Sequence, residues 1–144
     1  MKVSQDCVEL VKHFEGFEDT AYLCPANVWT IGYGRTRNVK EGDRITEPQA
    51  ERDLLEELEE FKHQVLNSVK VELKQNELDA LTSWTYNLGV GNLKSSTLLK
   101  KLNAGNKSEV PAEMIRWNKA NGKVLAGLTK RREAEAELWA KEVV

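Results

Sequence analysis

A glutamate at the end of the first expected helix is the residue best placed to act as an acid. Glu15 ends an apolar stripe at helical spacing and is followed by Gly16, a residue type that commonly terminates helices. A carboxyl group in the last turn of a helix feels the negative end of the helix dipole, which disfavours its ionised form. Burial beside Phe14 and Phe17 acts in the same direction. A carboxyl group kept protonated near neutral pH suits a general acid that protonates a leaving oxygen.

Two further side chains with useful chemistry follow at short separations. Eight residues separate Glu15 from Cys24, and five more separate Cys24 from Thr30. A thiolate can take a proton from water, and a threonine hydroxyl can both donate and accept a hydrogen bond. An unperturbed cysteine has a pKa of about 8.5, so without a lowered pKa Cys24 is a weak water-positioning group or a nucleophile. Its role stays open, and the alternative is a small apolar residue buried in a hairpin.

Local patterns predict the elements that position these residues. A first helix runs from a cap at Ser4 to Glu15, and the glycine-punctuated segment 20–39 predicts a hairpin or small sheet. A capping box that begins at Thr46 opens a long helix over 46–69. The predicted class is α+β and mostly helical. Further helices are expected at 75–88, 96–104, 108–119 and 129–142.

The long helix is expected to connect two lobes of one domain, residues 1–144. The sheet-bearing N-terminal lobe covers about 1–45, the helix 46–69 and the helical C-terminal lobe 70–144. One face of the helix is apolar at three- and four-residue spacing. The opposite face is expected to be solvated and carries Glu51, Glu56, Glu57, Glu59 and Glu60.

The composition is that of a folded globular protein. The chain has 144 residues, 40% hydrophobic and 31% charged, which supplies a core and excludes a disordered tail. Its apolar stretches are far shorter than the roughly 20 residues that span a bilayer. The N-terminus lacks the apolar segment of a signal peptide. We therefore expect no stable membrane insertion, no signal peptide and no signal-anchor.

The charge distribution and the positions of the cysteines and histidines limit which partners and metals are expected. Residues 1–60 carry 7 Lys and Arg against 14 Asp and Glu, whereas residues 61–144 carry 14 against 9. With a net charge of −2 and few aromatic residues among the basic ones, nucleic acid is not an expected partner. Neither the two cysteines nor His13 and His63 have the spacing of metal ligands. No metal and no cofactor are expected, and a monomer is the default.

Four ordered blocks of this sequence resemble the phage lysozyme (endolysin) family, muramidases of the T-even phage type. The first combines the spacing of Glu15, Cys24 and Thr30 with the Thr-Ile-Gly-Tyr-Gly run that begins at Thr30. Many family members have Asp at the position of Cys24. Together the blocks cover nearly the whole chain, and they imply a lysozyme-like fold. The other three are Trp-Thr-Tyr-Asn-Leu-Gly at 84–89, Ser-Thr-Leu-Leu-Lys-Lys-Leu-Asn at 96–103 and Gly-Leu-Thr-Lys-Arg-Arg-Glu at 127–133.

The resemblance implies a reaction and roles for the first three residues. The reaction is hydrolysis of the β-1,4 bond between N-acetylmuramic acid and N-acetylglucosamine in peptidoglycan, with inversion at the anomeric carbon. Glu15 is then the general acid, while Cys24 and Thr30 hold the attacking water. In an inverting glycosidase the two groups stand about 6.5–9.5 Å apart, on opposite faces of the sugar.

The resemblance also implies supporting and substrate-binding residues. An arginine from the C-terminal part, expected at Arg132 with its neighbour Arg131 as the alternative, pairs with Glu15. Such a pair opposes the effect of the helix dipole on the carboxyl group. A surface pair with Glu135 is the other option for either arginine. The residues expected to bind the sugar offer an aromatic ring, an amide and hydroxyls: Tyr86, Asn87, Thr36, and Ser96 or Thr97.

The implied role is host lysis by a phage or prophage endolysin that acts on peptidoglycan glycan strands. The chain is expected in the host cytoplasm until another protein, a holin, permeabilises the membrane and opens the way to the wall. Two rivals stay open. A lytic transglycosylase cleaves the same bond with Glu15 alone and closes a 1,6-anhydro ring, although Thr30 argues against it. A non-catalytic glycan-binding module predicts that Glu15→Gln leaves the effect on walls unchanged.

Overall fold

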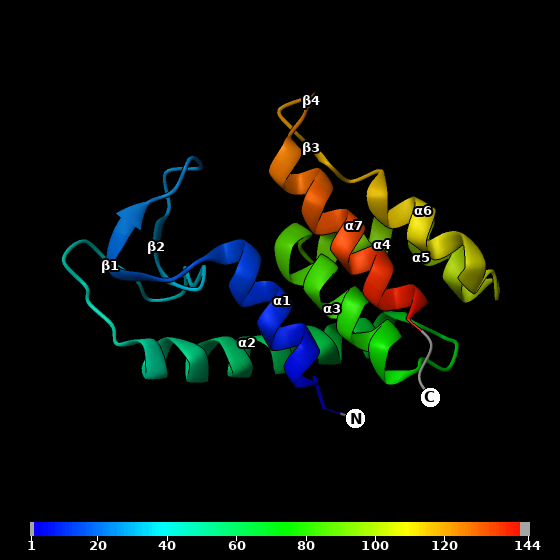
Figure 1. Ribbon diagram of the computed structural model, residues 1–144, viewed down its shortest axis with the longest axis horizontal. Coiled ribbons are helices and arrows are strands. Elements are labelled where there is room, and N and C mark those ends of the chain that lie inside the picture. The colour runs from blue at the N-terminus through cyan, green and yellow to red at the C-terminus, as the bar shows by residue number, and fades with distance from the viewer. Residues whose placement is uncertain (1, 142–144) are drawn as a thin grey trace.

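The computed structural model describes residues 2–141. The fold is mostly helical with two small hairpins, which confirms the predicted α+β class (Figure 1). None of the helices within these residues is long and apolar enough to span a bilayer. In chain order the elements are α1 (Gln5–Glu15), β1 (Glu18–Leu23), β2 (Trp29–Gly32), α2 (Glu47–Ser68), α3 (Gln75–Leu88), α4 (Val90–Ser95), α5 (Thr97–Asn103), η1 (Lys107–Glu109), α6 (Val110–Ile115), β3 (Lys119–Ala120), β4 (Lys123–Val124) and α7 (Ala126–Ala140).

The long helix α2 contributes residues to two hydrophobic clusters. Its first half packs with α1 in the first cluster through Leu54 and Leu58, and Val65 belongs to the second cluster around α3. The helix begins as expected, because the Thr46 hydroxyl accepts a hydrogen bond from the Gln49 amide at 3.4 Å. In Figure 1 α2 runs along the lower side of the molecule, from beneath the β1–β2 hairpin towards α1 and α3.

The N-terminal part places Glu15 beside the first hairpin. The helix α1 ends at Gly16, whose φ of 71° is a left-handed conformation that side chains disfavour. The chain then turns directly into β1, which pairs antiparallel with β2 so that Tyr22 stands opposite Thr30. The predicted hairpin is therefore present, with its two strands at 18–23 and 29–32.

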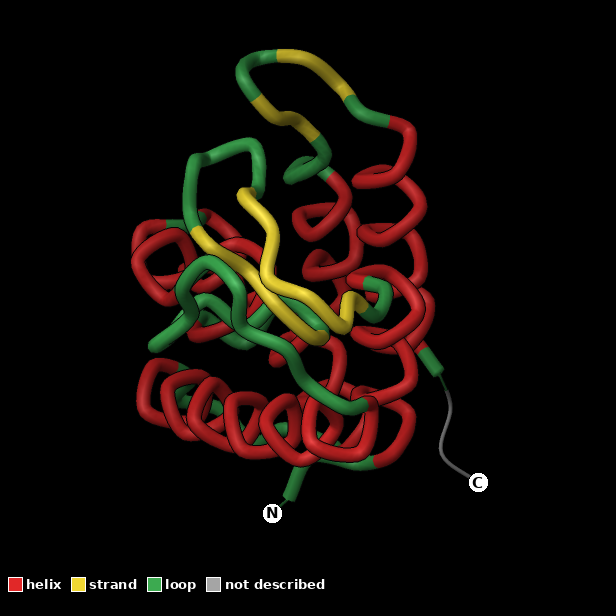
Figure 2. The backbone as a smooth tube through the Cα atoms, turned by 90° about the vertical axis from the view of Figure 1, so that its left-hand side faces the viewer, coloured by secondary structure: helices red, strands yellow, loops and turns green. Residues whose placement is uncertain are grey.

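The C-terminal part is built around α3. Ten consecutive residues of this helix, 76–85, are buried, because α1, α2 and α7 all pack against it. At its centre Trp84 is fully buried and meets Trp117 edge-on, with ring centroids 5.5 Å apart. Figure 2 shows the β1–β2 hairpin in front of the helices and the β3–β4 hairpin at the top.

Several local expectations need correction. The six-residue helix α4 was not predicted, because so short a segment carries too little periodicity. The last helix begins at Ala126 rather than Thr129, and its expected end at Glu142 lies outside the described residues. Ser4 precedes α1 as predicted, but its hydroxyl hydrogen-bonds the Asp79 carboxylate of α3 and makes no capping bond.

The helix expected over 108–119 is shorter than predicted. It consists of η1 and α6 and ends at Ile115, and the β3–β4 hairpin follows. The turn of this hairpin is Asn121-Gly122, and both residues have positive φ. An Asn-Gly pair is a strong hairpin signal. The hairpin was not predicted, because strands of two residues leave no alternating pattern.

Candidate active site

Glu15 lies in a cavity of about 280 Å³ where α3 meets the N-terminal part. Segments far apart in the sequence meet here, namely the end of α1, the turn after β2, the middle of α2 and the end of α3. The cavity brings together four of the predicted site residues, which makes it the candidate active site. Its other lining residues are Gly34, Thr36, Glu57, Phe61, Tyr86 and Asn87.

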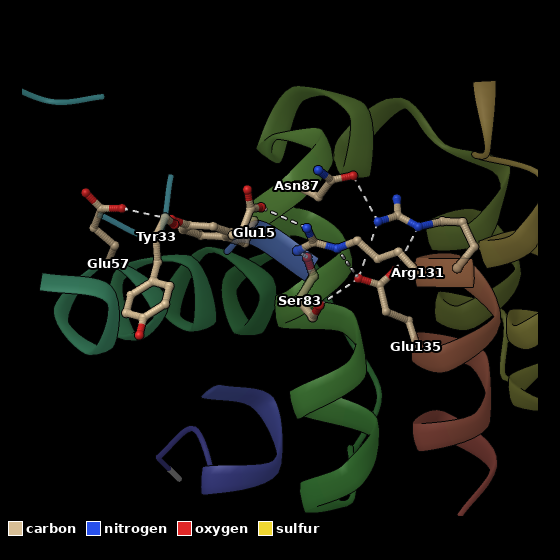
Figure 3. Close-up of polar contacts among 9 residues, drawn as sticks. Glu15, Tyr33, Glu57, Ser83, Asn87, Arg131 and Glu135 are labelled. Atoms are coloured by element: carbon tan, nitrogen blue, oxygen red, sulfur yellow. Dashed lines mark hydrogen bonds and ion pairs between the residues drawn. The ribbon is translucent and has the colours of Figure 1, made fainter. Parts of the chain in front are cut away.

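An arginine from α7 holds Glu15 (Figure 3). Arg131 Nη1 lies 2.8 Å from Glu15 Oε2. The Arg131 side chain is buried, with Nε 3.3 Å from Glu135 Oε2 and Nη2 3.4 Å from the Ser83 carbonyl oxygen. These contacts fix the guanidinium, which in turn fixes the direction of the Glu15 carboxyl group. The expectation that Arg132 makes this pair was wrong, and its neighbour makes it instead.

Arg132 belongs to an adjoining buried network. Successive helical residues point about 100° apart, so Arg132 is turned away from Glu15. Its Nη2 donates to Asn87 Oδ1 at 2.9 Å, and its Nε lies 2.8 Å from Glu135 Oε1 without the alignment of a hydrogen bond. Burial lowers the pKa of Arg132 to about 10 and raises the pKa of Glu135. The ion pair offsets part of the desolvation cost that both shifts express.

Ser83 and Glu135 complete this network, and the sequence analysis gave neither a place in the site. Ser83 Oγ donates to Glu135 Oε2 at 2.6 Å, and both side chains are fully buried. Glu135 had been considered only as a surface partner. The burial of Glu135 could have been predicted from its position in the helix. It lies four residues before Trp139, whose side chain is buried in the core, and residues four apart lie on the same face of a helix.

Gly34 forms the wall of the cavity beside Glu15. Its φ is +91°, and a Cβ placed there would lie 3.1 Å from Glu15 Oε1 and 3.5 Å from the Tyr86 hydroxyl oxygen. Any side chain at this position would push against both groups. The glycine is therefore required by the backbone conformation and by the close approach of the turn to the acid.

Tyr86 lines the cavity as expected, but its hydroxyl is engaged within the protein. The oxygen lies 2.9 Å from the Tyr33 carbonyl oxygen and 3.3 Å from Glu57 Oε2. The ring meets Phe61 edge-on at 5.3 Å. Glu57 was expected on the solvated face of α2 and is instead half-buried, and burial raises its pKa. The sequence contained a sign of this burial, because Glu57 lies three residues after Leu54 and therefore at the border of the apolar face of the helix.

Asn87 and Thr36 are the predicted sugar-binding residues with free polar groups. The Asn87 side-chain oxygen accepts from Arg132, and its NH2 group has no hydrogen-bond partner within residues 2–141. Thr36 is exposed at the rim of the cavity.

Ser96 and Thr97 do not line the cavity. Ser96 is buried and caps α5, because its hydroxyl accepts from the Leu99 amide at 3.0 Å and donates to the Leu93 carbonyl at 2.7 Å. Thr97 is exposed at the start of α5.

Cys24 and Thr30 lie together on the first hairpin. Backbone hydrogen bonds at Val28 and Ala26 lower the pKa of Cys24. The Thr30 hydroxyl adds a smaller effect in the same direction. Thr30 itself is buried and donates to the Val28 carbonyl at 3.0 Å. The backbone hydrogen bonds favour the thiolate form of Cys24, which is the form able to take a proton from water.

Tyr22 on β1 is influenced by the charges of both Glu15 and Cys24. Partial burial raises its pKa, and the negative charges of Glu15, Glu18 and Cys24 raise it further. Its phenol is thus within electrostatic range of both Glu15 and Cys24. Cys7 is different, since it is fully buried in the first cluster and burial raises its pKa. Both cysteines are free thiols in the structure.

The chain is similar to known proteins over the residues that form this site. The family model described as phage lysozyme matches residues 12–135, which include Glu15, the hairpin and the buried network. The chain belongs to the phage lysozyme family. The endolysin of Acyrthosiphon pisum secondary endosymbiont phage 1 is 44% identical over 143 residues, which cover 96% of this chain and 98% of the relative. As a phage lysozyme, the chain is a peptidoglycan-hydrolysing enzyme.

Two further comparisons show how much of other known proteins this chain corresponds to. The endolysin of Bacillus phage B103 is 44% identical over 142 residues, which cover 96% of this chain but only 54% of that relative. The solved muramidase domain of SpmX from Asticaccaulis excentricus is 36% identical, with a TM-score of 0.91 and with 98% of this chain and 99% of that chain covered. The lysozyme-like fold that the sequence blocks implied is therefore confirmed.

Proposed function

We propose that this phage lysozyme hydrolyses the β-1,4 bond between N-acetylmuramic acid and N-acetylglucosamine with inversion, and that Glu15 is its general acid. The observation that supports this best is the Glu15–Arg131 pair inside the cavity, at 2.8 Å. The arginine engages Oε2, which leaves Oε1 as the oxygen that gives the proton in this proposal. Gly34 leaves room beside Oε1, because a Cβ there would lie only 3.1 Å away.

The first half of the reaction is protonation of the leaving group. Glu15 Oε1 gives its proton to the glycosidic oxygen as the bond to the anomeric carbon breaks. The resulting carboxylate is stabilised at once by the Arg131 guanidinium, which is already in place. The Asn87 NH2 group and the Thr36 hydroxyl supply hydrogen bonds that orient the sugar in the cavity.

The second half is attack by water from the opposite face of the sugar. We assign the water to Cys24 and Thr30 on the hairpin. The thiolate accepts one proton from the water as its oxygen bonds to the anomeric carbon, and the Thr30 hydroxyl orients the water. The lowered pKa of Cys24 supports this role, because it increases the fraction of thiolate at a given pH.

The relatives named endolysin support a role in phage host lysis. We propose that residues 1–144 act as one monomeric lysozyme-like domain on peptidoglycan glycan strands. The enzyme is then held in the host cytoplasm until a holin permeabilises the membrane.

The test is a product analysis of purified peptidoglycan digested by the protein and by Glu15→Gln. The matched control is Glu18→Gln, which changes an exposed glutamate three residues away. We expect new reducing ends with the wild type and with Glu18→Gln, and none with Glu15→Gln. Anhydro ends would instead identify a lytic transglycosylase. An equal effect of all three proteins on walls, without cleavage, would identify a binding module.

A further inference from the structure

Glu57 is a second carboxyl group in the cavity that the proposed reaction does not use. It lines the same cavity as Glu15 but reaches it from α2. Glu15 is paired with Arg131, whereas no ion pair joins Glu57 to a cation within the part of the chain that the structure describes. Within residues 2–141 its only side-chain hydrogen bond is with the Tyr86 hydroxyl at 3.3 Å. Glu57 is at the left of Figure 3.

The nearby cations are engaged with other carboxylates. Arg35 Nη1 lies 3.2 Å from Asp53 Oδ2, and Arg37 makes two hydrogen bonds to Glu60, at 2.9 and 3.3 Å. Burial has the largest effect on the pKa of Glu57 and raises it, and the negative charge of Glu60 raises it further. The positive charges of Arg35 and Arg37 and the hydrogen bond with Tyr86 lower this pKa. The net result is a raised pKa for Glu57.

The hydrogen bonds of Tyr86 cannot all form when Glu57 is ionised. A tyrosine hydroxyl has one hydrogen, and the Tyr33 carbonyl oxygen at 2.9 Å can only accept. If Tyr86 donates to Tyr33, the contact with Glu57 becomes a hydrogen bond only when Glu57 itself carries a proton. If Glu57 is ionised, the carboxylate attracts the Tyr86 hydrogen and the Tyr33 carbonyl loses its donor.

The Tyr33 carbonyl matters because its peptide group continues into Gly34. That glycine is the wall beside Glu15 Oε1 and also adjoins the Tyr86 hydroxyl. We propose that Glu57 is a positioning residue: in its protonated form it donates to Tyr86, which donates to the Tyr33 carbonyl and holds the Gly34 wall beside Glu15. The link to catalysis rests on the proposed function, whereas the proton-dependent chain of hydrogen bonds does not.

The structure gives the expected pH dependence a sign. Glu57 remains protonated to a higher pH than an exposed glutamate, because its pKa is raised. Above that pKa the chain of hydrogen bonds rearranges and the wall loosens. The groups that face Glu57 and shape its titration are Arg35 and Arg37 from the turn after β2, Glu60 from α2 and Tyr86 from α3, with Glu15 acting through Tyr86.

The first measurement is kcat and KM against pH for the wild type, Glu57→Gln and Glu57→Ala. The glutamine amide donates to Tyr86 at every pH, so Glu57→Gln is expected to retain wild-type kcat at low pH. As the pH rises, the fall in kcat that the wild type shows when Glu57 ionises should be absent from this variant. Glu57→Ala is expected to lower kcat about three- to ten-fold, the loss of one net hydrogen bond, with little change in KM. Tyr86→Phe combined with Glu57→Ala should be no worse than the worse single variant.

The second measurement does not need activity. The backbone 15N shift of Gly34 reports hydrogen bonding at the Tyr33 carbonyl, because both belong to one peptide group. We expect this shift to follow the Glu57 titration in the wild type and not in Glu57→Gln or Tyr86→Phe. The matched control, Glu56→Gln, removes an exposed carboxyl on the same helix and should leave the titration intact. A Gly34 shift independent of Glu57 would overturn the proposal, as would a wild-type pH profile in Glu57→Gln. Absence of peptidoglycan cleavage by the wild type would overturn the proposed function alone.

Discussion

The two sides of the candidate active site are built on different supports. On the C-terminal side, Arg131, Arg132 and Glu135 are buried, and each makes two or more polar contacts. On the N-terminal side, Cys24 is partly exposed on a hairpin of two short strands. The acid is therefore oriented by the packed core, whereas the groups assigned to water rest on local backbone hydrogen bonds. Substitutions on the C-terminal side should lower the stability of the fold, whereas substitutions on the N-terminal side should mainly lower catalytic activity.

The largest effect on stability is expected for Glu135→Ala. The change leaves the buried Arg132 without its carboxylate and removes a partner of Arg131 and Ser83. Breaking a buried ion pair from one side costs about 3–5 kcal/mol, which urea denaturation will measure. Glu133→Ala, on an exposed position of the same helix, is the control and should cost less than about 0.5 kcal/mol. Equal losses in the two variants would mean that the network is not what fixes the C-terminal side.

The next effect is expected for Arg131→Lys. Lysine keeps the charge but cannot contact Glu15, Glu135 and the Ser83 carbonyl at once. Loss of one charge-assisted hydrogen bond, about 1.5–3 kcal/mol, lowers kcat roughly 10- to 100-fold. Turnover of soluble peptidoglycan fragments measures it, with exposed Lys130→Gln as the control. A kcat equal to that of the wild type would show that the pair does not orient the acid.

Cys24 should separate activity from stability on the hairpin side. Cys24→Ala is expected to abolish most turnover while the melting temperature stays near that of the wild type. Because the proposed role of Cys24 requires the thiolate, wild-type turnover should rise with pH through the lowered pKa of Cys24. In Cys24→Asp this rise should move to lower pH, since an aspartate ionises near pH 3.9. An active Cys24→Ala with an unchanged pH profile would remove the thiol from the mechanism.

The smallest expected difference is chemical and leaves the fold intact. Iodoacetamide should alkylate Cys24 first, because it is partly exposed and its pKa is lowered. Cys7 should react only on unfolding, since it is fully buried and its pKa is raised. Mass spectrometry of the native protein after short exposure distinguishes the two. Equal labelling would mean that the first hydrophobic cluster opens as readily as the hairpin.

The sequence was most informative where chemistry is local. The N-cap at Thr46 and the helix α3 could both be predicted, because each depends on residues within a few turns. The family blocks predicted the fold for the same reason, since each is a continuous segment. The β3–β4 hairpin escaped because its strands have two residues each.

Only the tertiary structure decided which residues meet Glu15. One residue along α7 changes the direction of a side chain by about 100°, so sequence position could not separate Arg131 from Arg132. Glu57 and Glu135 carry the signature of solvated helix faces, and their burial depends on Tyr86, Ser83 and the arginines that approach from other elements. The amino-acid sequence determined which acid and which hairpin were present. The packing of α2, α3 and α7 determined which carboxyl groups are paired and which line the cavity.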